Sequence, residues 1–583
     1  MPTPDRPFGQ SVRRLSRVWR RLCQRAARAG RRLYDPYPGW LARRISGRSG
    51  LPPAETGRFS LLTSVYAGTP ARLFEQTAQT VFDQAPSQFE WVLLAHGPVS
   101  PETDRVVQRV AMNPHVRFLQ REQNLGILGA MRLCLESAQG DYIVPLDADD
   151  LLTRDALAVL SHAIDQQGRP EFVYTDEDLL VGRRPRSPFF RPDWDPVLNL
   201  SNSYIWHLCA FRRLTALDLG VYSDSRANYC HDWDTVFRFA NAGFPIVHLP
   251  EVVHHWRRHA RSTTNQNAPH AGSLDSQRFV LERQIFRQPD PARYEVVEFP
   301  MFRGAQEWTI HRRPVDPQPA DLVILAGPSR AAPPAAVWLD GTDYPIRAVH
   351  FLGAPPDTVL GVEAASEPEQ LRDAPRCGRW AKPAVQFWPT VTLRDFAAAA
   401  AQLSGVMTVV CSAGLWPRAN DWLWEALKMF EFHADLCLIA GRVVSDSQEI
   451  VAGGELFEYG GPTCPEAGWL IDDPGPYGMF LKPRSVDAVA PEFFIARTAF
   501  LQRALLQIDP TAARDSWGVW LGGLAAEEGQ RVATNPLIAA MASPDWQPRG
   551  PIKPADLRLF AKRFSARAQR TRWFSGRRLP ASN

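Results

Sequence analysis

The stretch Gly140-Asp-Tyr-Ile-Val-Pro-Leu-Asp-Ala-Asp-Asp150 decides the fold, because a short apolar strand runs directly into three carboxylates. Asp147, Asp149 and Asp150 lie within four positions, where mutual repulsion and desolvation both disfavour them. A divalent cation such as Mn²⁺ or Mg²⁺ would remove both objections, because hard cations take oxygen ligands. Open α/β sheets also bind ligands beyond the carboxyl ends of their strands. The alternative is a solvated acidic turn that caps a helix beginning near Thr153.

The sequence around this stretch alternates strands with helices. Apolar runs predict strands at 59–66, 89–94, 116–119 and 142–146. Pro70 and Pro101 each stand near the start of an intervening helix, where the missing N–H of proline costs little. This alternation predicts βαβ units, a parallel sheet and right-handed crossovers. We therefore expect a Rossmann-like α/β domain with the acidic cluster at the carboxyl edge of its sheet.

The composition indicates a globular protein of two large units or several smaller ones. The chain has 583 residues, 45% of them hydrophobic and 22% charged. Its eight cysteines include no Cys-x-x-Cys pair, which argues against a zinc module or a disulfide framework and fits a reducing compartment. The sequence shows no apolar run of about 20 residues and no apolar signal-peptide core, so we expect a cytoplasmic protein.

The net charge of +4 is unevenly distributed. Residues 1–50 carry +11 and residues 549–583 carry +9, which leaves −16 for the rest. An acidic body with basic ends does not resemble a nucleic-acid-binding domain, whose basic surface normally lies on the fold itself.

Both basic ends also carry apolar residues. One helix face would hold Val12, Leu15, Trp19, Leu22 and Ala26, and the tail repeats the pattern with Leu557, Phe560, Phe564 and Trp573. Such segments can lie on an anionic membrane surface. We expect peripheral attachment to the inner face of the cell membrane; solvated basic tails are the alternative.

Further polar groups follow the acidic stretch. They occur at 176–178, 190–194, 202–207, 229–234 and 250–262, and they include carboxylates, imidazoles, guanidinium groups and aromatic rings. Carboxylates and an imidazole can bind a metal, and arginines can neutralise phosphate oxygens. A further carboxylate can deprotonate an acceptor hydroxyl. This set of groups predicts transfer from a nucleotide-diphosphate donor.

From Phe59 to about Arg287 the chain resembles glycosyltransferase family 2, whose members are inverting enzymes of the GT-A fold. The similar motifs occur in family order: Val65-Tyr66, Asn124-x-Gly126, Leu146-Asp-Ala-Asp-Asp150, Tyr174-Thr-Asp-Glu-Asp178, Phe190-Arg-Pro-Asp-Trp194, His231-Asp-Trp-Asp234 and His255-Trp-Arg257. The resemblance implies an α/β GT-A fold and a metal-dependent transferase that acts, with inversion, on a glycan or lipid-linked acceptor. The motifs at 174–178 and 190–194 look like those of a subgroup that makes bacterial surface polysaccharides of the O-antigen or capsule type.

The same resemblance implies a role for individual residues. Asp232 would be the catalytic base, and Asp149 and His255 would bind Mn²⁺ or Mg²⁺. The donor, a nucleotide-diphosphate sugar, would contact Thr63, Val65, Tyr66, Asn124, Gly126, Asp147, Arg257 and Arg261. The acceptor would lie near Asp176, Asp193, Trp194 and His207.

One position departs from the family. Many members have an aspartate pair followed by Gly-Ser after the second strand, and one of these aspartates contacts the nucleotide base. This chain has Ala95-His96-Gly97-Pro98 instead. The departure leaves the nucleotide, and therefore the sugar, open.

The second half resembles another copy of the same fold that has lost its acidic residues. A strand at 406–411 is followed by Ser412-Ala-Gly-Leu-Trp-Pro417, and Trp517-Gly-Val-Trp520 stands where a base motif would be. The domains expected are a basic segment at 1–54, a catalytic GT-A domain at 55–312, a Pro-rich linker at 313–319, a degenerate GT-A-like domain at 320–548 and a basic tail at 549–583. An unrelated α/β domain is the alternative for the second half.

Two other functions fit parts of the pattern. A sugar nucleotidyltransferase also uses a Rossmann-like sheet and an acidic metal site, but it would need a Gly-rich, basic phosphate loop after the first strand. Val65-Tyr-Ala-Gly-Thr-Pro70 offers no such loop. A non-catalytic scaffold or glycan-binding protein would bind no metal–nucleotide complex.

Overall fold

The computed structural model describes two compact units in the residues 35–48, 50–51, 58–84, 89–258, 271–302, 307–326, 335–353, 380, 383–458, 461–544, 546–564, 571 and 573. The described parts of unit 1 lie within 35–191 and 205–258, and those of unit 2 lie within 192–204 and 271–573. The division therefore falls before the Pro-rich segment 313–319, and it assigns one short internal segment, Pro192–Tyr204, to unit 2.

Unit 1 is built on one mixed sheet. Its strands are β1 (Phe59–Val65), β2 (Phe89–His96), β3 (Val116–Arg121), β4 (Tyr142–Pro145), β5 (Leu151–Leu152), β6 (Phe172–Val181), β7 (Arg184–Phe189), β8 (Cys209–Arg212) and β9 (Ile246–Arg257). The strand order is β3-β2-β1-β4-β8-β6-β9-β5, with β7 beside β6. Strands β1 to β4 are parallel, β6 and β9 are parallel, and β8 is antiparallel to its neighbours. The predicted α/β fold with a mostly parallel sheet is confirmed.

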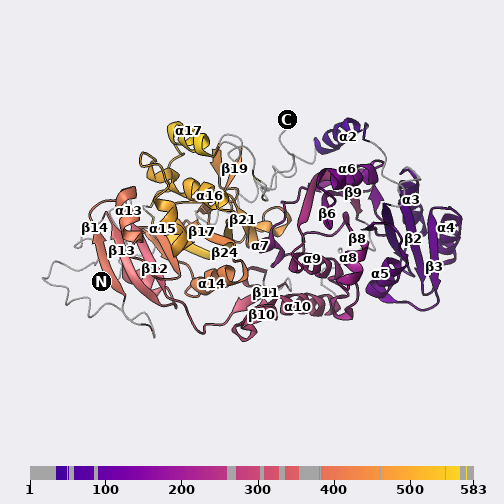
Figure 1. The fold of residues 1–583 in the computed structure, drawn as a ribbon, viewed down its shortest axis with the longest axis horizontal. Coiled ribbons are helices and arrows are strands. Elements are labelled where there is room, and N and C mark those ends of the chain that lie inside the picture. The colour runs from indigo at the N-terminus through magenta and orange to yellow at the C-terminus, as the bar shows by residue number, and fades with distance from the viewer. Residues whose placement is uncertain are drawn as a thin grey trace, which may run out of the picture. The chain divides into compact units, whose positions relative to one another are not determined.

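Helices connect these strands (Figure 1). They are α2 (Tyr37–Gly47), α3 (Ala71–Phe82), α4 (Pro101–Ala111), α5 (Gly126–Ser137), α6 (Ala156–Gln166), α8 (Arg213–Asp218), the 3₁₀ turn η2 (Ser225–Ala227) and α9 (His231–Asn241). Helix α4 begins as the sequence predicts: Ser100 caps it by accepting the N–H of Thr103, and Pro101 fills the first turn. The core between helices and sheet includes Phe74, Trp91 and Leu157, all fully buried.

Unit 2 contains a second sheet with the same connectivity. Its strands are β12 (Ala320–Leu325), β13 (Ile346–Leu352), β14 (Ala384–Trp388), β15 (Met407–Ser412), β16 (Leu415–Pro417), β17 (Leu436–Val444), β18 (Ile450–Ala452), β21 (Arg484–Val486), β23 (Phe493–Arg497) and β24 (Arg531–Ala542). The order β14-β13-β12-β15-β23-β17-β24-β16 matches that of unit 1 strand for strand, and every matched pair has the same relative direction.

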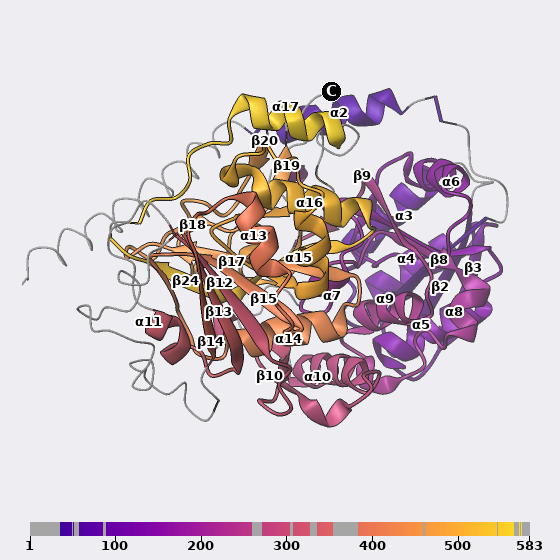
Figure 2. The ribbon, with the colours of Figure 1, turned by 60° about the vertical axis from the view of Figure 1, so that its left-hand side comes forward.

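Unit 2 has further helices, turns and strands outside this sheet (Figure 2). They are α7 (Pro196–Asn199), α10 (Ala271–Ile285), η4 (Pro291–Arg293), β10 (Tyr294–Glu298), η5 (Pro300–Phe302), β11 (Trp308–Arg312), α11 (Ala335–Asp340), α13 (Leu393–Ala400), α14 (Trp422–Phe432), β19 (Gly454–Glu458), β20 (Gly461–Thr463), η7 (Pro476–Leu481), β22 (Ala488–Val489), α15 (Thr498–Leu505), η8 (Arg514–Ser516), α16 (Trp517–Glu527) and α17 (Pro554–Arg563). Strands β20, β19 and β22 form a separate three-stranded sheet.

Hydrogen bonds explain why unit 2 begins before the linker and includes 192–204. Arg312 at the end of β11 pairs with Glu431 of α14 at 2.7 Å, and the Tyr294 hydroxyl donates to the same carboxylate at 2.8 Å. Asp195 caps α7 and also accepts the N–H and the hydroxyl of Ser485, both at 2.7 Å. These buried hydrogen bonds join residues that are far apart in the sequence, so no local sequence pattern predicts them.

The structure bears on the two basic ends differently. No helix in the described ranges is both long enough and apolar enough to cross a bilayer. The N-terminal stretch 12–28 lies outside those ranges. In the tail, Phe560, Phe564 and Trp573 are at least 92% buried in the core of unit 2. The expected C-terminal membrane-facing side is therefore wrong for these side chains, because they already pack against Trp520 and its neighbours.

Candidate functional site

The acidic stretch of unit 1 lies at the carboxyl edge of the sheet, as predicted. The chain leaves β4 at Pro145, passes Asp147, Asp149 and Asp150, and returns as β5. Strand β5 pairs antiparallel with the end of β9, with Leu151 opposite His255. This pairing brings the acidic stretch and the late histidine segment, about a hundred residues apart, to one place.

Asp150 fixes the end of β9. It is 1% exposed; one oxygen accepts the N–H of Arg257 at 2.8 Å, and the other lies 3.0 Å from Nε2 of His254. Burial would lower the pKa of His254, but bonds and charges from Asp150 and Glu177 raise it to about 9. His254 is therefore a buried imidazolium that holds the two acidic segments together.

Three side chains form a group that could hold a metal ion: Asp147, Asp150 and His207, whose ligand atoms lie within 4.8 Å of one another. Nε2 of His207 is 3.6 Å from an oxygen of Asp147. Carboxylate and imidazole are ligands that Mn²⁺ and similar cations accept. The sequence predicts His207 near the acceptor and Asp147 against the donor, so this grouping differs from the predicted metal pair Asp149 and His255.

The predicted metal ligand His255 is held by other groups. Its Nδ1 lies 2.7 Å from an oxygen of Asp178, and the Tyr37 hydroxyl of α2 donates to the other oxygen of Asp178 at 2.5 Å. A carboxylate behind an imidazole fixes the orientation of the ring and leaves Nε2 as its second nitrogen. Asp178 was not predicted to have this role, and nothing in the local sequence pattern marks it.

Asp232 lies in the same electrostatic environment as the metal-ligating group. It stands in the first turn of α9 with its side chain 27% exposed, and one oxygen lies 3.5 Å from Nε2 of His231. Burial would lower the pKa of His207, yet the negative charges of Asp147 and Asp232 outweigh it and raise that pKa. A partly exposed carboxylate of this kind can accept a proton from a hydroxyl group.

Arg257 carries a buried guanidinium near the acidic stretch. It is 5% exposed, and none of its three guanidinium nitrogens has a hydrogen-bond partner among the described residues. Burial lowers its pKa, and the charges of Asp150 and Asp149 act in the opposite direction. A guanidinium in this situation has a strong tendency to bind an anion such as a phosphate.

The donor-contact residues predicted on β1 divide into two kinds. Thr63 is buried, donates to the carbonyl of Leu146 at 2.9 Å and accepts from the indole of Trp91 at 3.0 Å. Val65 is fully buried as well, so both residues serve the framework in this structure. Tyr66, by contrast, is 45% exposed at the end of β1.

The predicted Asn124 and Gly126 shape the start of α5. The Asn124 side chain accepts the N–H of Gly126 at 2.9 Å, and Gly126 has φ +68°, which favours glycine. His96, which replaces the family's aspartate, accepts the N–H of Leu125 through Nδ1 at 3.2 Å. Burial lowers the pKa of His96. A cavity of about 650 Å³ lies against this helix and includes Gly126 and Asn228.

The other predicted contacts lie elsewhere. Asp176 is 3% exposed and already accepts the N–H of Arg191 at 2.8 Å and contacts His248 at 2.9 Å, which favours a structural role. Asp193 and Trp194 belong to unit 2. Arg261 lies outside the described residues.

Strand register identifies the matching positions in unit 2. Phe59 pairs with Tyr142 and Tyr142 with Arg212 in unit 1, as Ala320 pairs with Met407 and Met407 with Arg497 in unit 2. Counting from these pairs matches Asp147-Ala-Asp-Asp150 with Ser412-Ala-Gly-Leu415 and His207 with Glu492. On the other side, Leu151 opposite His255 corresponds to Trp416 opposite Met541. Unit 2 therefore has no acidic residue at any matched position of this stretch.

The base position is also changed. Helices α9 and α16 occupy the same place in the strand order and both have 11 residues, which matches Asp232 with Gly518. A Cβ at Gly518 would lie 1.9 Å from the carbonyl oxygen of Val489. The backbone of Val489 occupies the space that the first side-chain atom of an acidic residue would need. No side chain therefore fits at position 518 without rearrangement.

Comparison with known proteins gives a family for unit 1. Residues 61–219 match the model of glycosyl transferase family 2. Uncharacterized protein y4gI of Sinorhizobium fredii is 31% identical over 232 residues, which cover 39% of this chain and 25% of that protein. O-antigen biosynthesis protein RfbC of Myxococcus xanthus is 28% identical over 264 residues, covering 44% and 20%. Amylovoran biosynthesis glycosyltransferase AmsE of Erwinia amylovora is 25% identical over 203 residues, covering 33% and 74%.

The matches cover parts of the proteins concerned. The chain spans a quarter or less of the first two relatives. Among solved structures, S. aureus TarS 1–349 in complex with UDP-GlcNAc matches 40% of this chain and 68% of its own, with 17% identity and a TM-score of 0.33. The family match runs from β1 past β8 and includes the acidic stretch, and with the strand order it confirms the predicted GT-A fold. Within its first unit the chain carries a region, residues 61–219, that matches glycosyl transferase family 2.

Proposed function

We propose that unit 1 transfers a sugar from a nucleotide-diphosphate donor to a glycan or lipid-linked acceptor, with inversion, in surface-polysaccharide biosynthesis. The observation that carries this proposal is Arg257, a buried guanidinium with no hydrogen-bond partner among the described residues, beside Asp149 and Asp150. A diphosphate would supply the acceptors that Arg257 lacks. The names of two relatives, O-antigen biosynthesis protein and amylovoran biosynthesis glycosyltransferase, support the polysaccharide context.

Each residue has a defined task in this reaction. Arg257 binds diphosphate oxygens, and the charge that it carries favours departure of the nucleoside diphosphate. Asp232 takes the proton of the acceptor hydroxyl as its oxygen forms a bond to the anomeric carbon and the bond to the diphosphate oxygen breaks. A single displacement from the opposite face inverts the anomeric centre.

The residues present fit a divalent cation. Asp147, Asp150 and His207 offer two carboxylates and an imidazole within 4.8 Å of one another. A cation held there would neutralise diphosphate charge as a Lewis acid. Asp178, Tyr37 and His254 would keep the adjoining imidazole and carboxylate groups in place.

Metal-dependent donor binding tests this assignment directly. We expect at least one of UDP, GDP and dTDP, each added with Mn²⁺, to raise the melting temperature of the protein. A ligand at 100 times its Kd adds about 2.7 kcal/mol to the free energy of unfolding. Asp147→Ala should lose this rise without loss of its own stability, because the Asp147 side chain is 59% exposed.

Asp141→Ala is the matched control, since its side chain is 60% exposed and lies at the other end of β4. It should retain the full nucleotide response. An Asp147→Ala protein that responds to nucleotide and Mn²⁺ as the wild type does would exclude Asp147 as a ligand. If no nucleotide shifts the wild type, the proposed function is wrong.

We further propose that unit 2 is a degenerate copy that performs no transfer, so the chain has one active centre. Matched positions hold Ser412, Gly414 and Leu415 in place of the acidic stretch. The closed space at Gly518 removes the base as well.

We also propose that the N-terminal residues hold the protein on the inner face of the membrane. Their +11 charge over residues 1–50 supports this, since each basic residue near an anionic surface contributes about 1 kcal/mol. In flotation assays, deletion of residues 1–34 should lower recovery with phosphatidylserine vesicles severalfold and change nothing with phosphatidylcholine vesicles. Equal flotation of full-length and shortened protein would contradict the proposal.

A further inference from the structure

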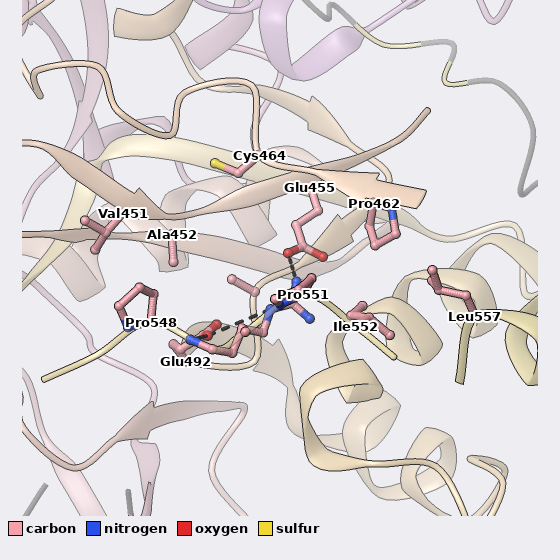
Figure 3. Close-up of a pocket in the computed structure, with 13 residues that line it drawn as sticks. Val451, Ala452, Glu455, Pro462, Cys464, Glu492, Pro548, Pro551, Ile552 and Leu557 are labelled. Atoms are coloured by element: carbon pink, nitrogen blue, oxygen red, sulfur yellow. Dashed lines mark hydrogen bonds and ion pairs between the residues drawn. The ribbon is translucent and has the colours of Figure 1, made fainter. Parts of the chain in front are cut away.

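Unit 2 has a cavity of about 250 Å³ at the same edge of its sheet at which unit 1 has its acidic stretch (Figure 3). Glu492, which matches His207 in register, directly precedes β23, and its carbonyl accepts the N–H of Ser412 at the carboxyl end of β15 at 2.8 Å. Unit 2 therefore has a hollow at the sheet edge that matches the acidic stretch of unit 1, but with a different lining.

Many of the residues that line this cavity come from a connection between strands that is longer in unit 2 than in unit 1. Residues 190–208 connect β7 to β8, two strands of the sheet of unit 1. The matching connection in the sheet of unit 2 is formed by residues 453–492 and is about twice as long. This longer connection forms the β20-β19-β22 sheet and supplies Glu455, Pro462, Cys464 and Ala490 to the cavity. The segment that follows β24 supplies Pro548 to Ile552.

Three charged groups gather in the cavity. Glu455 and Glu492 are each 5% exposed, and Figure 3 shows both side chains in the cavity. The guanidinium of Arg549 pairs with both carboxylates, with its Nε 3.8 Å from Oε1 of Glu492. Arg549 pairs with Oε1 of Glu455 through its side chain and donates its backbone N–H to Oε1 of Glu492 at 3.1 Å. Its remaining terminal nitrogen donates to the carbonyl of Asp515.

Two acceptors remain unsatisfied. Oε2 of Glu455 and Oε2 of Glu492 have no hydrogen-bond donor among the described residues. A buried carboxylate oxygen left in this state costs about 1–3 kcal/mol or more, so such atoms usually have a partner. Burial accordingly raises the pKa of Glu455 to about 7, against the opposing charge of Arg549.

The lining defines the ligand that fits. Two glutamates and one guanidinium give the cavity no net positive charge that would attract phosphates, nucleotides or acidic sugars. It presents two hydrogen-bond acceptors beside an apolar wall that includes Val451, Ala452 and Ile552. A volume below the roughly 300–1,000 Å³ of drug-sized sites suits a single ring. Neutral sugars combine hydroxyl donors with apolar C–H faces in this way.

We propose that this cavity binds one neutral sugar unit of the glycan acceptor, with hydroxyl groups donating to the free oxygens of Glu455 and Glu492. The identification of that glycan as the acceptor rests on the proposed function of unit 1. Unit 2 would then raise the local concentration of acceptor chains instead of acting on a donor.

Saturation-transfer NMR on the full-length protein tests the proposal. The probes are the methyl glycosides of mannose, rhamnose, galactose and N-acetylglucosamine. At least one should receive saturation from the wild type, and Glu455→Gln and Glu492→Gln should each weaken its binding about tenfold, because an amide nitrogen replaces an acceptor oxygen. Glu528→Gln, an exposed change in the same unit, should bind as the wild type does.

A second variant does not depend on the buried charges. Gly550 lines the cavity at its exposed rim, and a Cβ there would meet nothing within 4 Å. Gly550→Trp should therefore fold normally and reduce glycoside binding by narrowing the opening. Gly50→Trp, at an equally open position in unit 1, serves as its control.

The outcomes separate this proposal from the proposed function of unit 1. Asp232→Asn should bind glycosides normally, and Glu492→Gln should raise KM for the glycan acceptor without changing kcat. The cavity proposal is overturned if no probe receives saturation, if the cavity variants bind as the wild type does, or if spermidine displaces the glycoside, which would indicate an ammonium site. Glycoside binding without any nucleotide response would support the cavity and contradict the transferase.

Discussion

Replacing Asp232 with asparagine is expected to lower the rate of sugar transfer by about 10²- to 10⁴-fold, the usual contribution of a general base. The side chain keeps its size and stays in the first turn of α9, but it can no longer take the proton of the acceptor hydroxyl. Donor binding should be unchanged, because the metal-ligating group and Arg257 remain intact. Initial rates of nucleoside diphosphate release, with a lipid extract as acceptor source, measure the loss.

A matched variant makes the result specific to this position. Asp218→Asn changes an exposed carboxylate at the end of α8 and should transfer at the wild-type rate. Transfer by Asp232→Asn within a few-fold of wild type would show that the base is elsewhere. If a second substitution at Asp515 of unit 2 then abolished that activity, catalysis would belong to the second copy.

Replacing Arg257 with methionine is expected to weaken binding of the nucleotide and Mn²⁺ roughly 10- to 100-fold, in keeping with about 1.5–3 kcal/mol for a hydrogen bond to a charged group. Without ligand, the variant should be at least as stable as the wild type. Arg257 is 5% exposed with no acceptor among the described residues, so methionine removes a buried charge that lacks hydrogen bonds there and keeps most of the apolar stem. Thermal melts with and without nucleotide measure both effects.

Arg154→Met, at an exposed arginine before α6, is the control and should change neither quantity. Loss of stability in ligand-free Arg257→Met would mean that the guanidinium has a structural partner, and the argument for a diphosphate there would fail. Tighter nucleotide binding by the variant would have the same consequence.

Strand positions and the acidic stretch were predictable because each rests on a local pattern. An apolar run followed directly by Asp147, Asp149 and Asp150 predicts a strand end with a ligand site. The strands expected at 59–66 and 89–94 appear as β1 and β2 with ends within two residues. The likeness of the second half to the first was also visible, in the run from Val406 to Pro417.

The side chains that support the site were not predictable, because their contacts depend on strand pairing and not on the spacing of residues in the sequence. His207 joins Asp147 and Asp150 only because β8 runs antiparallel beside β4. Asp178 holds His255 through the register of β6 on β9. The place of segment 192–204 was not predictable for a similar reason: Asp195 bonds to Ser485, 290 residues later.

The contact at Gly518 has an evolutionary consequence. A duplicated enzyme domain that has lost a carboxylate can regain it by a single codon change, as long as the space for the side chain persists. Here the carbonyl of Val489 stands 1.9 Å from where a Cβ would be, so reversion needs a backbone shift before any acid can return. Under our proposal that unit 2 is a degenerate copy, the loss of the carboxylate is therefore difficult to reverse. Selection could then act on unit 2 only for a function other than sugar transfer. A cavity with a new set of lining residues can arise under that condition.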